Sequence, residues 1–458
     1  MVKDLTNGKS IRVMFMFVLP MLLSIVFQQM YNLADSVIAG KFAGEDALAA
    51  VGASYPITMI FMAIAFGCSI GCSVVIARLF GAKETAKLKT AVWTTVIAAG
   101  ALSALLTVVG LLTCKPLLRA VDTPENIFED GCLYLYIYVG GLVFLYLYNV
   151  FNGIFQALGD SRTPLYFLIG SSIGNIGLDI LFVAAFRMGV GGVAWATFIA
   201  QGIACVLSGL TLFRRLRALK TDEPYKKFSF PMLGKIAIVA VPSILQQSFI
   251  SVGNIFIQSL INGYGSSVVA GYSAAMRLNN FAVNAVSAVG NGLSSFTSQN
   301  IGAHKVERVP KGFSAGLIIG LCVVVPFFCA FFFGGKACMK LFLDDTSALA
   351  MDTGVTYLKI LSPCYFVIGA KIVADGVLRG SGAMGRFMIT TFSDLVIRVA
   401  LSFVLEPSMG TSGIWWSWPI GWIAATALSL IFYFTGYWCR AGKNSDRCTA
   451  TDQSADVS

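Results

Sequence analysis

Long apolar stretches with almost no charged residues recur about twelve times along the chain. Each reaches the length of roughly 20 residues that a helix needs to cross a bilayer. The first six lie near residues 13–39, 47–77, 91–114, 132–158, 164–186 and 189–213, and the last six near residues 236–261, 268–299, 312–334, 353–378, 387–405 and 412–438. The pattern predicts an all-α polytopic membrane protein with twelve transmembrane helices.

One long polar segment, residues 214–235, separates the two groups of six stretches. We therefore expect an N-terminal six-helix lobe over residues 1–213, a cytoplasmic linker over 214–235 and a C-terminal six-helix lobe over 236–440. Residues 441–458 are polar and are expected to form a disordered cytoplasmic tail.

The two halves repeat one another. An offset of 222 residues carries Pro20 onto Pro242 and Asn32 onto Asn254, and residues 151–159 resemble residues 374–382 in their glycine pattern. Because each half has an even number of spans, the repeats have the same topology and are related by an axis along the membrane normal. Two such lobes can enclose a central cavity that opens to either side of the membrane.

Composition and charge agree with a membrane protein. The 458 residues are 57% hydrophobic and 12% charged, against about 25% charged in soluble domains. The net charge of +10 comes from loops, so the membrane surface explains it better than nucleic acid does. With the N-terminus inside, inner segments carry 23 Lys and Arg residues and outer loops carry 6, which predicts a plasma (inner) membrane protein with both termini cytoplasmic. We expect no cofactor.

Acidic residues inside the spans are the main candidates for function, because a charge in the bilayer is costly and usually has a role. The four such residues are Asp35, Asp179, Asp375 and Asp394. Asp375 has Lys371 and Arg379 one helical turn away on either side, and Asp394 has Arg398 one turn away. Neighbours at this spacing can pair, so structural ion pairs are expected for both.

Asp35 and Asp179 have no such cation nearby, whereas Asn175 lies one turn before Asp179 and on the same helix face. At about 1.5 Å of rise per residue, Asp35, Asp179 and Thr197 all lie roughly 10 Å from the outer ends of their spans. Two carboxylates, an amide and a hydroxyl suit a proton or a hard cation such as Na⁺. Two alternatives remain: the carboxylates share protons as like charges, or Asp35 is simply an interfacial residue.

Several motifs in a fixed order carry a family resemblance. They occupy residues 27–35, 50–52, 77–83, 152–164, 174–179 and 189–197. With them the chain resembles the multidrug and toxic compound extrusion (MATE) family over roughly residues 10–440. The resemblance implies two six-helix lobes that exchange H⁺ or Na⁺ for a small amphipathic, often cationic organic compound by alternating access.

The resemblance is to the DinF-like branch. In that branch it implies a first-lobe cation site at Asp35, Asn175, Asp179 and Thr197, and a bending proline at Pro20.

NorM-like members differ, because they place acids in the seventh and tenth spans. Here the seventh span has Gln246 and Gln247, and Ile368 falls where the tenth-span aspartate would be. The coupling ion is therefore expected to bind in the first lobe.

Polar side chains within the first and fourth spans are candidates for the substrate cavity: Gln28, Tyr31, Asn32, Asn149 and Asn152. Each is equally consistent with hydrogen bonds between helices.

Two alternative functions, a flippase and an intramembrane transferase, would each require particular charged residues inside the spans. A lipid-linked saccharide flippase would line its cavity with cations, and the spans contain Arg277, Lys359, Lys371 and Arg398. An intramembrane transferase needs clustered acids for Mg²⁺, but no Asp-Asp-x-x-Asp run occurs within a span, and the Asp344–Asp345 pair lies in a predicted outer loop. We therefore expect a monomeric transporter in the lipid bilayer and not an enzyme.

Overall fold

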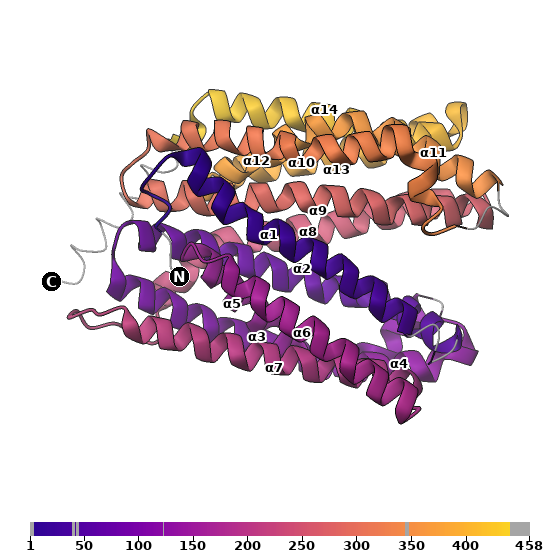
Figure 1. Ribbon diagram of the computed structural model, residues 1–458, viewed down its shortest axis with the longest axis horizontal. Helices are drawn as coiled ribbons and strands as arrows, with labels where there is room; N and C mark the ends of the chain where they lie inside the picture. The colour runs from indigo at the N-terminus through magenta and orange to yellow at the C-terminus, as the bar shows by residue number, and fades with distance from the viewer. Residues whose placement is uncertain (1–3, 39–41, 43–44, 122, 344–347, 440–458) are drawn as a thin grey trace. The chain divides into compact units, whose positions relative to one another are not determined.

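The computed structural model describes residues 4–38, 42, 45–121, 123–343 and 348–439, apart from the side chains of residues 33–37 and 45–48 (Figure 1). The helices of the first half are α1 (Ser10–Ile38), α2 (Glu45–Gly81), α3 (Thr85–Ala120), α4 (Glu125–Gly140), α5 (Leu142–Ala157), α6 (Arg162–Asp179), a π-helix (Ile180–Ala185) and α7 (Gly189–Ala218). Those of the second half are α8 (Phe230–Asn262), α9 (Ser266–Gly302), α10 (Arg308–Met339), α11 (Ala348–Leu361), a 3₁₀ turn (Ser362–Cys364), α12 (Tyr365–Ser381), α13 (Met384–Met409) and α14 (Thr411–Phe434).

The helices confirm the all-α membrane fold. Ten candidate spans in the described residues are long and apolar enough to cross a bilayer, and α4 and α5 together form an eleventh that is bent by 48°. The remaining helix, α9, has 37 residues and is more polar, yet at about 1.5 Å per residue it is also long enough to cross. With α9 the predicted number of twelve spans is reached.

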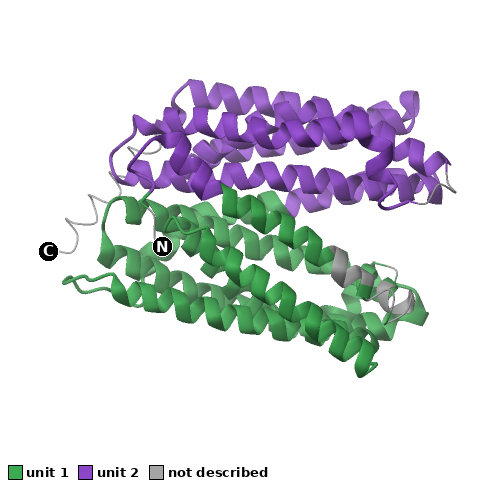
Figure 2. Ribbon diagram, in the orientation of Figure 1, with its two compact units in different colours: residues 1–4, 19–247 green, residues 5–18, 248–458 purple. Residues whose placement is uncertain are grey.

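The chain divides into two compact units (Figure 2). Unit 1 contains residues 1–4 and 19–247, and unit 2 contains residues 5–18 and 248–458. Two boundaries between the units lie inside helices, one in α1 and one in α8. They fall within six residues of Pro20 and Pro242, respectively. The bounds at 213 and 236 are not tested by this division, and the expected tail, residues 441–458, lies outside the described residues.

Each unit contains one broken span at the same place in the repeat. In unit 1 the break falls at Gly141, where an added Cβ would lie 3.0 Å from a ring carbon of Phe198 in α7. In unit 2 the helix is interrupted by the 3₁₀ turn that contains Pro363, whose ring removes a backbone hydrogen bond. The offset between Gly141 and Pro363 is again 222 residues. The break is therefore a feature of the repeat, although it has a different cause in each unit.

Glycines allow α12 to approach α9 closely in unit 2. A Cβ on Gly376 would lie 2.6 Å from the carbonyl oxygen of Gly290, a backbone atom that cannot move aside. We expect Gly376→Val to destabilise the protein by about 3 kcal/mol or more, at the upper end for overpacking. Thermal melting of the purified protein in detergent measures this. Gly170→Val is the matched control, because no atom lies within 4 Å of a Cβ there; equal melting temperatures for the two variants would refute the close-approach argument.

Candidate functional site

The start of α6 is held by a buried acidic residue. Asp160 lies in the turn before α6, where its carboxylate accepts backbone N–H groups of Arg162 and Thr163, both at 3.1 Å, and the Thr163 hydroxyl at 2.8 Å. Arg215, near the end of α7, forms an ion pair with the same carboxylate. Burial would raise the pKa of Asp160, but the hydrogen bonds from Arg215 and Thr163 outweigh it, so the pKa lies below its ordinary value. This cluster fixes α6 against α7.

The other end of α6 carries the predicted amide and carboxylate. Ser172, Asn175 and Asp179 are buried and recur at the spacing of one helix face, and Asn175 and Asp179 are 2% and 1% exposed. A π-helix begins immediately after Asp179. Such wider turns are rare and frequently mark functional sites.

The Asn175 amide is buried, and neither its oxygen nor its nitrogen has a hydrogen-bond partner among the described residues. A buried amide left without a partner costs about 1–3 kcal/mol, so a bound species would offset a real penalty. With Asp179 one turn away, the site offers the oxygen ligands that a hard cation prefers, and the same atoms suit a proton. No cluster of three or more His, Cys, Asp or Glu residues that could hold a metal ion occurs in the described part of the chain.

The described side chains do not join the other two predicted site residues, Asp35 and Thr197, to this pair. Asp35 falls within α1, but its side chain lies outside the described ones. Thr197 is half-buried on α7, and no described hydrogen bond joins it to Asn175 or Asp179. The four-residue cation site therefore stays a prediction, of which α6 supplies a buried pair.

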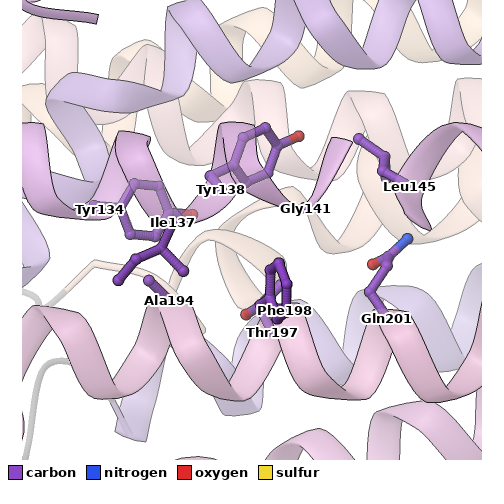
Figure 3. A pocket seen from close by; sticks show the side chains of 9 residues that line it. All are labelled: Tyr134, Ile137, Tyr138, Gly141, Leu145, Ala194, Thr197, Phe198 and Gln201. Carbon is purple, nitrogen blue, oxygen red and sulfur yellow. The ribbon is translucent and has the colours of Figure 1, made fainter. Parts of the chain in front are cut away.

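Thr197 instead lines a pocket of about 350 Å³, its open mouth included. Figure 3 shows side chains of α4, α5 and α7 around it; the lining residues are Tyr134, Ile137, Tyr138, Gly141, Leu145, Ala194, Thr197, Phe198 and Gln201. Aromatic rings dominate, and Thr197 and Gln201 supply a hydroxyl and an amide. The tyrosines and Gln201 were not predicted from the sequence; the adjacent glycines at 140 and 141 are the signal there that could have pointed to a break beside them.

Pro20 weakens α1 at one turn. The ring lies inside the helix and removes the N–H that would bond to the carbonyl of Met16. One turn later the Ser24 hydroxyl donates to the Pro20 carbonyl at 2.9 Å, a contact that tends to bend helices. Bending at this point is therefore built into the local chemistry.

The predicted cavity residues differ in how far their side chains are engaged. Gln28 and Asn32 are exposed on α1 and make a long contact of 3.4 Å with each other, and Tyr31 between them is half-buried. On α5, the Asn149 amide donates to the Leu145 carbonyl of its own helix at 2.8 Å, whereas the Asn152 side-chain oxygen has no hydrogen-bond partner among the described residues. Gln28 and Asn32 are thus the members of the set that are exposed.

The ion pair expected for Asp375 is confirmed. Lys371 and Asp375 are buried and lie 2.7 Å apart, and the hydroxyls of Thr390 and Ser429 donate to the same carboxylate at 3.2 and 2.7 Å. Arg379 donates to the side chain of Asn291 on α9 at 2.6 Å. Asp375 is therefore a fully bonded structural residue that joins α12, α13 and α14.

The ion pair expected for Asp394 and Arg398 was wrong. The Asp394 side chain makes no described contact with Arg398, whose guanidinium lies over the ring of Trp418, 4.2 Å from its centroid. Stacking on tryptophan stabilises a desolvated guanidinium, and this partner on α14 is invisible in the spacing along α13.

Both halves of the chain match a known protein family. The family model MatE matches residues 20–181 and 242–404, and each match begins at a repeat proline. Two proteins of Bacillus subtilis (strain 168) are similar over nearly their whole lengths. "Probable multidrug resistance protein YpnP" is 28% identical, over 95% of this chain and 97% of that protein. "Probable multidrug resistance protein YoeA" is 27% identical, over 93% of each.

Among solved structures, the outward-facing conformation of a multidrug resistance MATE family transporter of the MOP superfamily superposes with a TM-score of 0.88. The two chains are 23% identical, over 96% of this chain and 98% of that one. At this identity the likeness establishes the twelve-helix fold.

Proposed function

Because the chain belongs to the MatE family of membrane transporters, we propose that it exports small amphipathic, often cationic organic compounds across the plasma (inner) membrane in exchange for H⁺ or Na⁺. The names of its relatives, which are probable multidrug resistance proteins, support the kind of substrate. The observation that carries the exchange mechanism is the buried Asn175–Asp179 pair at the start of the π-helix. An ionisable side chain buried within a membrane span is costly and is a candidate for binding an ion or a proton.

The proposed cycle uses the first-half residues as follows. Asp35 and Asp179, with Asn175 and Thr197, bind the incoming ion and lose their net negative charge. Neutralisation favours a bend of α1 at Pro20, where one backbone hydrogen bond is already missing. Because a ligand shifts an equilibrium only by its differential affinity for the two states, the ion must bind more tightly in the state that releases the compound.

The compound itself is proposed to contact the exposed amides of α1 and the aromatic pocket. Gln28 and Asn32 provide polar contacts, and Tyr134, Tyr138 and Phe198 provide aromatic faces that attract organic cations. Both termini are proposed to be cytoplasmic, since inner segments hold far more Lys and Arg than outer loops.

A lipid-linked saccharide flippase is not favoured. Its pyrophosphate would need several available cations, but Lys371 is engaged by Asp375 and Arg398 by the Trp418 ring. Two of the four cations inside the spans are thereby occupied.

Dye efflux from vesicles tests the proposal. Protein reconstituted into liposomes with a fluorescent cationic dye should expel it after a jump in pH or in Na⁺, and Asp35→Asn should lose this gradient-driven efflux. The exposed acid Asp352 of α11 provides the control, since Asp352→Asn should behave as wild type. Undiminished coupled efflux in Asp35→Asn would overturn the mechanism, and comparison of the two jumps identifies the ion.

A further inference from the structure

A second set of buried polar side chains lies in unit 2, on one face of α13. Thr391, Asp394 and Arg398 recur at the spacing of one helix face and are 5%, 8% and 4% exposed. They face α14, where a Cβ on Gly421 would lie 2.9 Å from the Asp394 Oδ1 atom. Trp418, one turn before Gly421, carries the Arg398 guanidinium on its ring.

One polar atom in each of four neighbouring side chains is buried without a described hydrogen bond. Thr391 Oγ1, Asp394 Oδ1, Arg398 Nε and Trp418 Nε1 are all buried, and none has a hydrogen-bond partner in the part of the chain that the structure describes. Most buried polar groups in proteins are bonded, and exceptions that gather in one place call for an explanation such as a bound ion, water or proton.

Asp394 and Arg398 form no described ion pair, although their spacing along α13 would allow one. Residues four apart on a helix can pair, and on α12 Lys371 and Asp375 do so at 2.7 Å. An ionised, buried carboxylate without a partner is among the most unfavourable arrangements in a protein interior. A neutral carboxyl group beside Gly421 avoids this penalty, and the charge that remains, on the guanidinium, is stabilised by the Trp418 ring.

In the sequence repeat, this set lies on helices that correspond to those of the candidate site of unit 1. The offset of 221 residues that relates Gly189 to Gly410 also relates Thr197 to Trp418, and α13 is the counterpart of α6. The second unit thus has its own ionisable set in the corresponding helices, but an arginine is part of it. Only Thr391 and Asp394 supply oxygen atoms in this set, too few to coordinate a metal cation, so a proton is the cation that fits.

We propose that Asp394 is a proton-binding site of unit 2 and that Arg398 is its alternative partner. With the proton bound, the carboxyl group is neutral and Arg398 rests on Trp418, as in this structure. When the proton leaves, the carboxylate draws the guanidinium off the ring into an ion pair, so that net charge at the site changes by one. The site lies outside the machinery of the proposed function, and its test needs no transport.

Few other charged groups act on this site. On α12, Lys371 and Asp375 are bonded to each other, and Thr390 of α13 and Ser429 of α14 complete that carboxylate. The phenols of Tyr272 on α9 and Tyr357 on α11 interact electrostatically with Arg398. Neither α14 nor residues 248–262 of α8 contain an acid, lysine, arginine or histidine. Arg398, one turn along the same face of α13, is therefore the charged residue placed to pair with Asp394.

Infrared difference spectroscopy over a pH titration of the reconstituted protein tests the proposal. The carbonyl stretch of a protonated carboxyl group should fade as the pH rises, and this component should be lost in Asp394→Asn. In Arg398→Gln the carboxylate has no partner, so the same band should persist to higher pH. Glu406→Gln, which alters a carboxyl group near the end of the same helix, should leave the band unchanged.

Two outcomes would overturn the proposal: a full band in Asp394→Asn, or a band in Arg398→Gln that titrates as in wild type. The Arg398→Gln arm stands independently if Asp394→Asn does not fold. Asp179→Asn should retain the Asp394 band, so failure of the transport mechanism and failure of this proposal are separable.

Discussion

Replacing Arg215 with methionine is expected to lower the free energy of unfolding by about 3 kcal/mol, the lower end for a broken buried ion pair. The variant would leave a buried charge without its cationic partner: Asp160 is 2% exposed and would keep its carboxylate charge after the loss of the guanidinium, although Thr163 and backbone N–H groups still donate to it. The Arg215 side chain is 27% exposed, so solvent screens part of the interaction. Thermal melting in detergent measures the loss.

Arg217→Met is the matched control, because Arg217 is in the same last turn of α7 but exposed. It should melt close to wild type, and equal losses in the two variants would show that the ion pair contributes nothing. The pH dependence has a definite sign. Because the folded-state pKa of Asp160 is lowered from 3.8, the stabilisation is fully present above that pH and is lost as pH falls through the folded value. The difference in melting temperature between wild type and Asp160→Asn should therefore close in acid.

The fold could be predicted from the sequence because bilayer-spanning helices leave a direct record in it. Apolar runs of sufficient length must be helical where no water bonds the backbone. Even α9, which is more polar than the other spans, was predicted as a span. The two broken spans were not predicted. Gly141 and Pro363 allow a break, but many transmembrane helices contain such residues and continue, because neighbouring groups can satisfy the backbone.

At the candidate sites, the confirmed predictions concern residues within one helix, and the prediction that was wrong depends on a contact between helices. Lys371 and Asp375 pair as their spacing predicted, and Asn175 and Asp179 share a buried face. The failures depend on other helices: Trp418 of α14 takes Arg398 away from Asp394. Spacing along one helix shows which side chains can meet, but the choice between two partners depends on the packing of its neighbours.

The aspartate of α6 offers a test of ion binding that does not depend on transport. A ligand that binds only the folded protein stabilises it by about 2.7 kcal/mol at 100 times its dissociation constant. We therefore expect the coupling ion to raise the melting temperature of wild-type protein, with ionic strength held constant in the Na⁺ titration.

Asp179→Asn should abolish this ion-dependent stabilisation and the coupled dye efflux together. The substitution keeps the shape of a side chain that is 1% exposed but removes the charge that would attract H⁺ or Na⁺, leaving two amides one turn apart on α6. Glu129→Gln, at an exposed position of α4, is the control in the same unit and should respond to the ion as wild type does. Melting curves against Na⁺ and against pH provide the measurement. If Asp179→Asn still gains the wild-type stabilisation from either cation, that cation binds elsewhere and α6 does not hold the coupling site.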